Sequence, residues 1–133
     1  MAFVHPLRVR YNECDAQGHV FNANYAVYFD IAVTELWREA LGSYGALLDH
    51  GLDLVVAEMA LRFRAPARFD DELSLELVIT RLGTTSTTAR IDVRRGETLV
   101  VEGEIRHVFV REGTTEKAQI PDQIRTVLQR YAS

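Results

Sequence analysis

Residues 23–41, ANYAVYFDIAVTELWREAL, form the longest periodic stretch of the sequence. Apolar residues recur there at intervals of three and four, which is the period of an α-helix. They are Tyr25, Tyr28, Phe29, Ala32, Val33, Leu36, Trp37 and Ala40. Because this stripe covers more than half of the helix circumference, we expect a nearly enclosed helix, capped by Asn22 and ended by Gly42.

One strand is expected before this helix and four after it. Residues 3–11 alternate apolar Leu7, Val9 and Tyr11 with charged neighbours, and Pro6 within them is typical of an edge or a strand start. The later strands carry apolar or small side chains at the odd-numbered positions of residues 55–63, 73–79, 87–93 and 99–109. This pattern predicts an antiparallel sheet with one buried face. Residues 121–131 are expected to form a short closing helix that starts at Pro121.

The sequence therefore predicts an α+β fold in which one sheet wraps around one helix. With 133 residues and no internal repeat or linker, residues 1–133 are expected to form a single domain around one core.

Composition narrows the possible partners. The chain has 15 Lys and Arg against 19 Asp and Glu, so a nucleic acid partner is not expected. Its single cysteine, Cys14, cannot form an internal disulfide, and the first residues lack the features of a signal peptide. No apolar run approaches the ~20 residues of a transmembrane helix. We expect a cytoplasmic protein.

Two blocks of sequence resemble a known family. Residues 15–28, DAQGHVFNANYAVY, resemble the D-x-x-G-x-V-x-x-x-N-Y signature of hotdog-fold thioesterases of the 4-hydroxybenzoyl-CoA thioesterase type. Residues 65–73, APARFDDEL, are similar to the strand corner of the tol-pal-associated acyl-CoA thioesterase subgroup. The resemblance implies a hotdog fold, in which an antiparallel five-stranded sheet wraps around one long central helix and a short C-terminal helix follows.

The resemblance also implies an acyl-CoA thioesterase. Asp15 would be the catalytic carboxylate, as general base or nucleophile, and the backbone amide of Asn22 would polarise the thioester carbonyl. This chemistry is physically coherent, because a helix N-terminus offers unpaired N–H donors to a developing oxyanion. No metal and no cofactor would be needed, and coenzyme A would enter as part of the substrate.

Other residues near the motif have lesser expected roles. His19 is a candidate to orient substrate or share a proton with Asp15, or else a solvated loop histidine. Gly18 is expected to supply a positive φ, Asn24 to fix the loop, and Tyr25 to pack in the core beside the substrate. Glu58 interrupts an apolar run where a substrate channel or a partner subunit would lie, which makes it a further substrate-binding candidate.

Competing uses of the reactive side chains are less favoured. Cys14 with His19 as base would need a lowered thiolate pKa, and a small buried residue is the preferred interpretation. His107 falls on the apolar face of its strand and is expected in the core. The histidines and the cysteine lack metal-ligand spacing. Five strand-region arginines are available for coenzyme A, namely Arg62, Arg64, Arg68, Arg90 and Arg94.

Three alternative functions stay open at this point. The same fold hosts acyl-thioester dehydratases or hydratases, and thioesterases that act on acyl carrier protein. A non-catalytic acyl-thioester-binding module is the third. Because a sheet around one helix leaves an open edge, we expect at least a homodimer, or a homotetramer formed by pairing two dimers.

Overall fold

The structure is a computed structural model that describes all 133 residues. Its elements, in chain order, are β1 (Phe3–Arg8), η1 (Tyr11–Glu13), α1 (Asn24–Leu41), α2 (Ala46–Asp49), β2 (Leu52–Phe63), β3 (Glu72–Leu82), β4 (Ser86–Arg95), β5 (Thr98–Arg111), α3 (Asp122–Leu128) and η2 (Gln129–Tyr131). The strands form one antiparallel sheet of order β1-β3-β4-β5-β2. The predicted α+β hotdog fold is confirmed.

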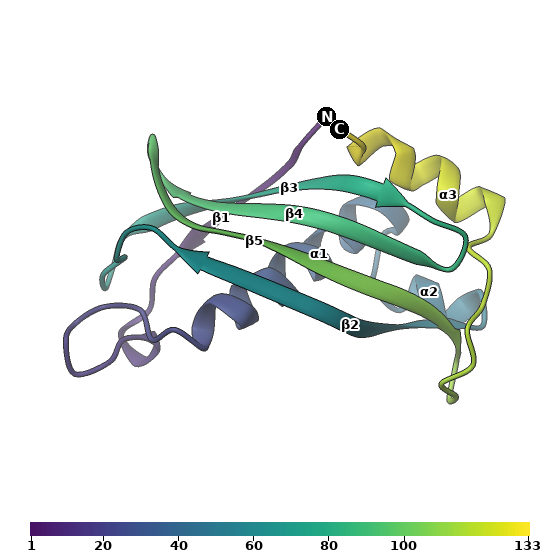
Figure 1. Cartoon of the computed structure of the whole chain (residues 1–133), viewed down its shortest axis with the longest axis horizontal. Helices are drawn as coiled ribbons and strands as arrows, with labels where there is room; N and C mark the ends of the chain where they lie inside the picture. Colours follow the sequence, from purple (N-terminus) through teal and green to yellow (C-terminus); the bar gives the residue numbers. More distant parts are fainter.

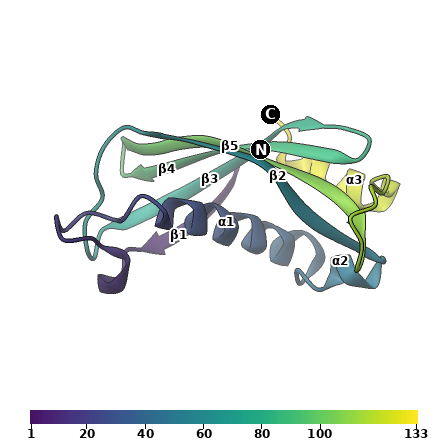
Figure 2. The ribbon, with the colours of Figure 1, turned by 60° about the horizontal axis from the view of Figure 1, so that its bottom comes forward.

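The sheet curves over α1, which lies along its inner face (Figures 1 and 2). Tyr28, Phe29 and Ala32 of α1 are fully buried, and so are Leu75 of β3 and Ile105 of β5, in one apolar cluster. Burying a Phe, Leu or Ile side chain contributes about 1.5–3 kcal/mol, so contact with the sheet, more than helix propensity, stabilises α1.

Helix and sheet approach each other closely at Gly103 of β5. A Cβ atom at this position would lie 2.9 Å from the ring of Phe29 and 2.2 Å from the carbonyl oxygen of Ala60. Glycine is therefore required there so that the Phe29 ring can rest directly on the sheet backbone.

The odd-position pattern holds in β3 and β4 and from Val101 to Phe109 of β5. It fails at Leu99, which pairs with the outward-facing Arg94 across a register shift, while Val100 is buried. It also fails in part of β2. A register shift lies between Val56 and Glu58, so Ala57 is an extra residue in the pairing with β5. Before this bulge, Leu54 and Val56 pair with the inward-facing Phe109 and His107. The prediction was therefore wrong for Val55 and Ala57, because a bulge shifts which side chains face the core.

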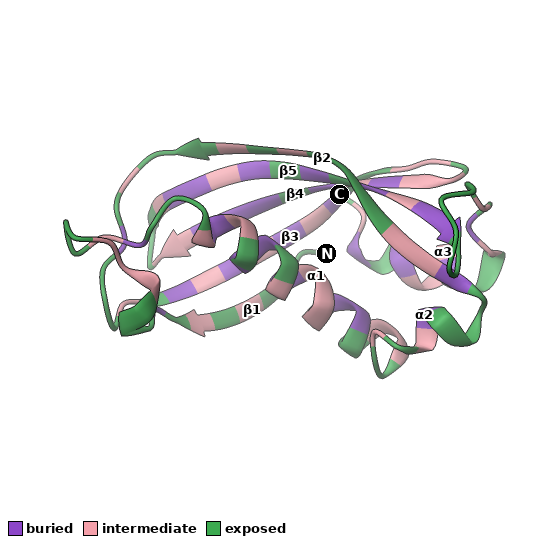
Figure 3. Ribbon diagram, turned by 90° about the horizontal axis from the view of Figure 1, so that it is seen from below, coloured by how far each residue is buried: buried purple, intermediate pink, exposed green.

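Most of β2 is also exposed, unlike its neighbour β5 (Figure 3). The strand lies at one edge of the sheet, and Val55, Val56 and Phe63 are all exposed. The expectation of one uniformly buried face fails here because no second strand of the chain pairs with this edge.

Two expected boundaries change and one is confirmed. The first strand ends at Arg8, so Tyr11 lies in the 3-10 turn η1 and is 80% exposed, and its predicted inward orientation was wrong. Ala23 is the N-cap of α1 and forms no side-chain cap, so Asn22 does not have the predicted capping role. Gly42 ends the helix with a positive φ, as expected.

The two chain ends meet beside the sheet (Figure 1). The amino group of Met1 donates to the Ala132 carbonyl oxygen at 3.2 Å. Helix α3 and η2 pack against the sheet through buried Ile124, Leu128 and Tyr131. No helix in the structure has the length and apolarity that crossing a lipid bilayer requires.

Candidate active site

Asp15 lies in a compact loop between η1 and α1. Its backbone N–H donates to the His19 carbonyl oxygen at 2.8 Å, and its own carbonyl oxygen accepts from Gly18 N–H at 3.0 Å. Cys14 and Val20 close the loop through an antiparallel bridge. Gly18 has a φ of +80°, which confirms the expected backbone requirement.

The Asp15 carboxylate is held by one of its two oxygens. Oδ1 accepts from the backbone N–H groups of Gln17, at 2.9 Å, and His19, at 3.3 Å. Oδ2 has no hydrogen-bond partner in the protein. The carboxylate is thus oriented by its own loop and presents a free oxygen.

Asp15 lines a cavity of about 300 Å³ at the N-terminus of α1 and the end of β2. Its lining residues are Asp15, Gln17, His19, Val20, Asn22, Tyr25, Phe63, Arg64, Ala65 and Pro66. The structure therefore brings Asp15 and Asn22 to one cavity. The rings of Tyr25 and Phe63 meet edge to face at 5.8 Å and supply an apolar wall.

Two backbone donors at the start of α1 are left unpaired. Asn24, Tyr25 and Ala26 donate to the carbonyl oxygens of the residues three positions earlier, in a tightened first turn. The N–H groups of Asn22 and Ala23 donate to no protein acceptor. Free N–H groups at a helix N-terminus favour negative charge, which an oxyanion would bring.

Of the other predicted site residues, two line the Asp15 cavity and two do not. His19 and Tyr25 line the Asp15 cavity, although the His19 side chain makes no hydrogen bond to Asp15. Asn24 contacts the loop, since its Nδ2 donates to the Glu13 carbonyl oxygen at 2.8 Å. Glu58 does not line this cavity, because its exposed carboxylate faces Arg106 of β5 at 3.9 Å.

Two other reactive side chains, Cys14 and His107, do not line the Asp15 cavity. The Cys14 thiol lies 3.8 Å from the Arg10 carbonyl oxygen, and desolvation and then the nearby Glu13 carboxylate raise its pKa. A raised thiol pKa disfavours the nucleophilic thiolate. His107 is 8% exposed on the inner face of β5, as expected for a core histidine.

The sequence did not single out Glu13 and Tyr28, which support the Asp15 loop. Glu13 Oε1 accepts from the Tyr28 hydroxyl at 2.9 Å and from Arg10 N–H at 2.8 Å. The available signal was Tyr28 itself, because a tyrosine on a buried helix stripe needs a partner for its hydroxyl.

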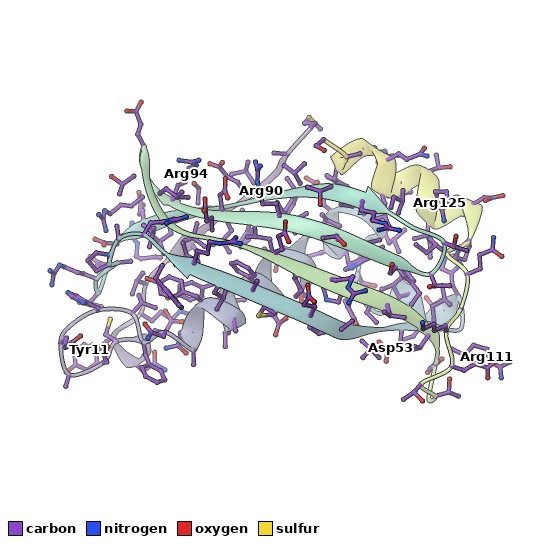
Figure 4. All side chains as sticks on the ribbon, in the orientation of Figure 1. Tyr11, Asp53, Arg90, Arg94, Arg111 and Arg125 are labelled. Carbon is purple, nitrogen blue, oxygen red and sulfur yellow. The ribbon has the colours of Figure 1, made fainter.

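The five arginines considered for coenzyme A are not gathered at one place. Arg90 and Arg94 lie on the outer face of the sheet (Figure 4), where both face Asp92 within 4 Å. Arg64 lines the Asp15 cavity and pairs with Glu102 at 2.7 Å. Only Arg64 of the five is thus a cavity residue.

Comparison with known proteins identifies relatives over the whole chain. Residues 17–109 match a family model described as the thioesterase superfamily. The acyl-CoA thioester hydrolase YbgC of Escherichia coli is 36% identical over 121 residues, which cover 90% of each chain. A hypothetical protein of Thermus thermophilus has a TM-score of 0.90 at 31% identity and covers 100% of this chain and 99% of its own. A thioesterase-superfamily protein of Jannaschia sp. CCS1 shares the fold with a TM-score of 0.92 at 24% identity, over 99% of this chain and 94% of its own.

Proposed function

The chain belongs to the thioesterase superfamily, and on this premise we propose that it hydrolyses an acyl-CoA to a carboxylic acid and coenzyme A. One observation carries the proposal. The oriented Asp15 carboxylate and Asn22, whose backbone N–H is unpaired, line the same cavity. A thioester carbonyl bound between them would have a base or nucleophile on one side and an oxyanion donor on the other.

In the proposed reaction, the free Oδ2 of Asp15 either attacks the carbonyl carbon directly or activates a water molecule that attacks it. As a general base, Asp15 takes a proton from water while the water oxygen attacks the carbonyl. As a nucleophile, Asp15 forms an acyl anhydride that water then opens. In both routes the C–S bond breaks, the sulfur leaves as thiolate, and the proton from water ends on the thiol.

The surrounding residues have proposed roles in binding. The Asn22 amide would stabilise the negative carbonyl oxygen, which in comparable sites contributes on the order of 10²–10³-fold to the rate. Tyr25 and Phe63 would pack against the apolar part of the acyl thioester. His19, part-buried at the rim of the same cavity, would orient the substrate.

We further propose that the active enzyme is at least a homodimer joined along β2. An edge strand that is long, apolar and exposed is a template for pairing with another chain. The same strand ends at Phe63, which lines the Asp15 cavity, so a second copy would stand beside the site. Cys14 is a free thiol, which fits the reducing cytoplasm that we propose as the location.

The test is thiol release from a panel of short, long and aromatic acyl-CoAs. We expect the wild-type protein to hydrolyse at least one of them and Asp15→Asn to lower kcat on the order of 10²–10⁴-fold, because the amide can neither attack nor accept a proton. Asp49→Asn, on the exposed end of α2, is the matched control and is expected to keep full activity.

Two results would contradict the assignment. Equal rates for Asp15→Asn and wild type would remove Asp15 from the chemistry. An absorbance change of an enoyl thioester without thiol release would instead identify a hydratase or dehydratase. If the acyl group is released faster from acyl carrier protein than from coenzyme A, the substrate carrier is acyl carrier protein and the proposed thioester hydrolysis still stands.

A further inference from the structure

Glu13 lies just before the loop that carries Asp15 and is hydrogen-bonded to the residues that follow this loop. Its carbonyl oxygen accepts from Phe21 N–H at 2.9 Å and from the Asn24 side chain at 2.8 Å. Phe21 directly precedes Asn22, whose amide is the proposed oxyanion donor. Residue 13 thus closes the base of the loop and ties it to the first turn of α1.

The Glu13 side chain adds a bond to the buried interior of the helix. Its Oε1 accepts from the hydroxyl of Tyr28, which lies one turn further along α1 and is fully buried. Burial and then the hydrogen bond to Glu13 raise the pKa of the Tyr28 phenol, so the hydroxyl stays protonated as a donor. A buried tyrosine hydroxyl that donates to a single acceptor holds that acceptor in a fixed position.

Resting on the proposed function, we infer that Glu13 is a positioning residue: anchored by Tyr28, it sets the Asp15 carboxylate relative to the Asn22 amide. The two catalytic groups come from opposite sides of a loop closed by Glu13. A misplacement of about 1 Å between such groups can cost on the order of 10²-fold in rate. Glu13 itself does not contact the substrate in this scheme.

The geometry allows the hydroxyl of Tyr28 to be removed without disturbing the cavity wall. The Tyr28 ring packs edge to face against Tyr25 at 5.6 Å, and Tyr25 packs against Phe63. Tyr28→Phe keeps these ring contacts and deletes only the bond to Glu13. Glu13→Gln keeps an oxygen that can accept from both Tyr28 and Arg10, whereas Glu13→Ala removes the acceptor.

The chain offers a matched control at its other end. Tyr131 is also buried, and its hydroxyl donates to Glu39 Oε2 at 2.7 Å. Tyr131→Phe therefore removes the same type of hydrogen bond, between a tyrosine and a carboxylate, away from Asp15. Comparison of the two Tyr→Phe variants separates a loss of stability from a loss of alignment.

The experiment measures kcat, KM and thermal midpoint on the best acyl-CoA, and amide hydrogen exchange in residues 14–20. We expect Tyr28→Phe to lower kcat about 10-fold and Glu13→Ala on the order of 10²-fold, each with KM changed less than about twofold. We expect Glu13→Gln to keep most of the wild-type kcat. Exchange in the loop should be faster in Tyr28→Phe than in Tyr131→Phe.

Three results would contradict the positioning role of Glu13. If Tyr28→Phe and Tyr131→Phe have the same kcat and the same loop exchange, the positioning role is overturned while the proposed hydrolysis stands. If Glu13→Gln is as defective as Glu13→Ala, the carboxylate charge matters, and a positioning role is overturned. If the wild-type protein releases no thiol from any acyl-CoA, the proposed function fails first and this inference fails with it.

Discussion

His107 is a buried histidine on the inner face of β5 that the proposed chemistry does not use. Its side chain borders a groove of about 280 Å³ that is also lined by Asp30 and Thr34 of α1 and by Tyr44. Burial lowers the pKa of the His107 imidazole from 6.5 to about 4. The folded protein therefore keeps this side chain neutral under mildly acidic conditions in which the unfolded chain binds a proton.

This difference predicts how stability depends on pH. Between about pH 6.5 and pH 4 the unfolded state binds one proton more than the folded state at His107, so the free energy of unfolding falls as the pH falls. In full, protonation of His107 in the unfolded state lowers the free energy of unfolding by about 3 kcal/mol, and below about pH 4 this residue lowers it no further. Urea unfolding of wild type and His107→Gln at pH 7 and pH 4.5 measures it.

The glutamine variant should lose less stability than wild type over that interval, because residue 107 no longer titrates. The carboxylates that titrate in the same range are common to both proteins and cancel in the comparison. His50→Gln, at an exposed position beside α2, provides the control and should retain the wild-type pH dependence. Parallel stability curves for wild type and His107→Gln would contradict a neutral buried imidazole.

At the residue level, the parts of the site that are continuous in the chain could be predicted from the sequence. Asp15, Gly18 and Asn22 fall within eight residues of one motif, and their placement at one loop follows from that spacing. The contact between Glu13 and Tyr28 joins residues fifteen positions apart. It depends on how the loop folds back onto α1, which local patterns do not specify.

The long helix and the inner strands are elements that the hydrophobic pattern alone could predict. Strands β3 and β4 are paired on both sides, so their alternating residues are buried and the period of two is clear. Strand β2 has a neighbour on one side only, and its bulge shifts the alternation at Ala57. Neither an open edge nor a bulge leaves a distinctive signal in an apolar stretch.

The exposed β2 edge leads to a prediction about assembly. Val56→Lys places a charge on the inward-facing side of this strand, where burial by a second copy would be costly. We expect the dimer dissociation constant to rise at least about 10²-fold, with loss of thioesterase activity at concentrations where the wild type is dimeric. Sedimentation velocity over a concentration series, with activity on the same samples, measures both.

The opposite edge of the sheet supplies the control. Val4 of β1 is also exposed, at 55%, on a strand with one neighbour, so Val4→Lys introduces the same charge at an edge without the proposed role. It should sediment as wild type does. Dissociation by both variants would show a general effect of edge charge, and a wild type that is monomeric throughout would refute the β2 dimer.

At the scale of the whole molecule, α1 is covered by the sheet on one face only (Figure 2). Val27 on this helix is 49% exposed, and together with the exposed residues of β2 it leaves apolar surface that a second copy would bury. If association buries this surface, folding and assembly are thermodynamically linked.

This linkage predicts that thermal stability depends on protein concentration. The midpoint of thermal unfolding should rise by about 2–3 °C for each tenfold increase in concentration, because mass action favours the folded dimer over unfolded monomers. Differential scanning calorimetry across a hundredfold range measures the shift. A midpoint independent of concentration, with reversible unfolding, would indicate that the single chain is the stable unit.

The contact between Met1 and Ala132 has a practical consequence for protein engineering. Because the two ends of the chain are hydrogen-bonded neighbours, a short flexible linker can join them into a continuous backbone. New ends can then be opened at the exposed hairpin turn around Gly96, between β4 and β5. Such a circular permutant keeps residues 13–41 in one uninterrupted piece, so the loop and helix that carry Asp15 and Asn22 are still synthesised together.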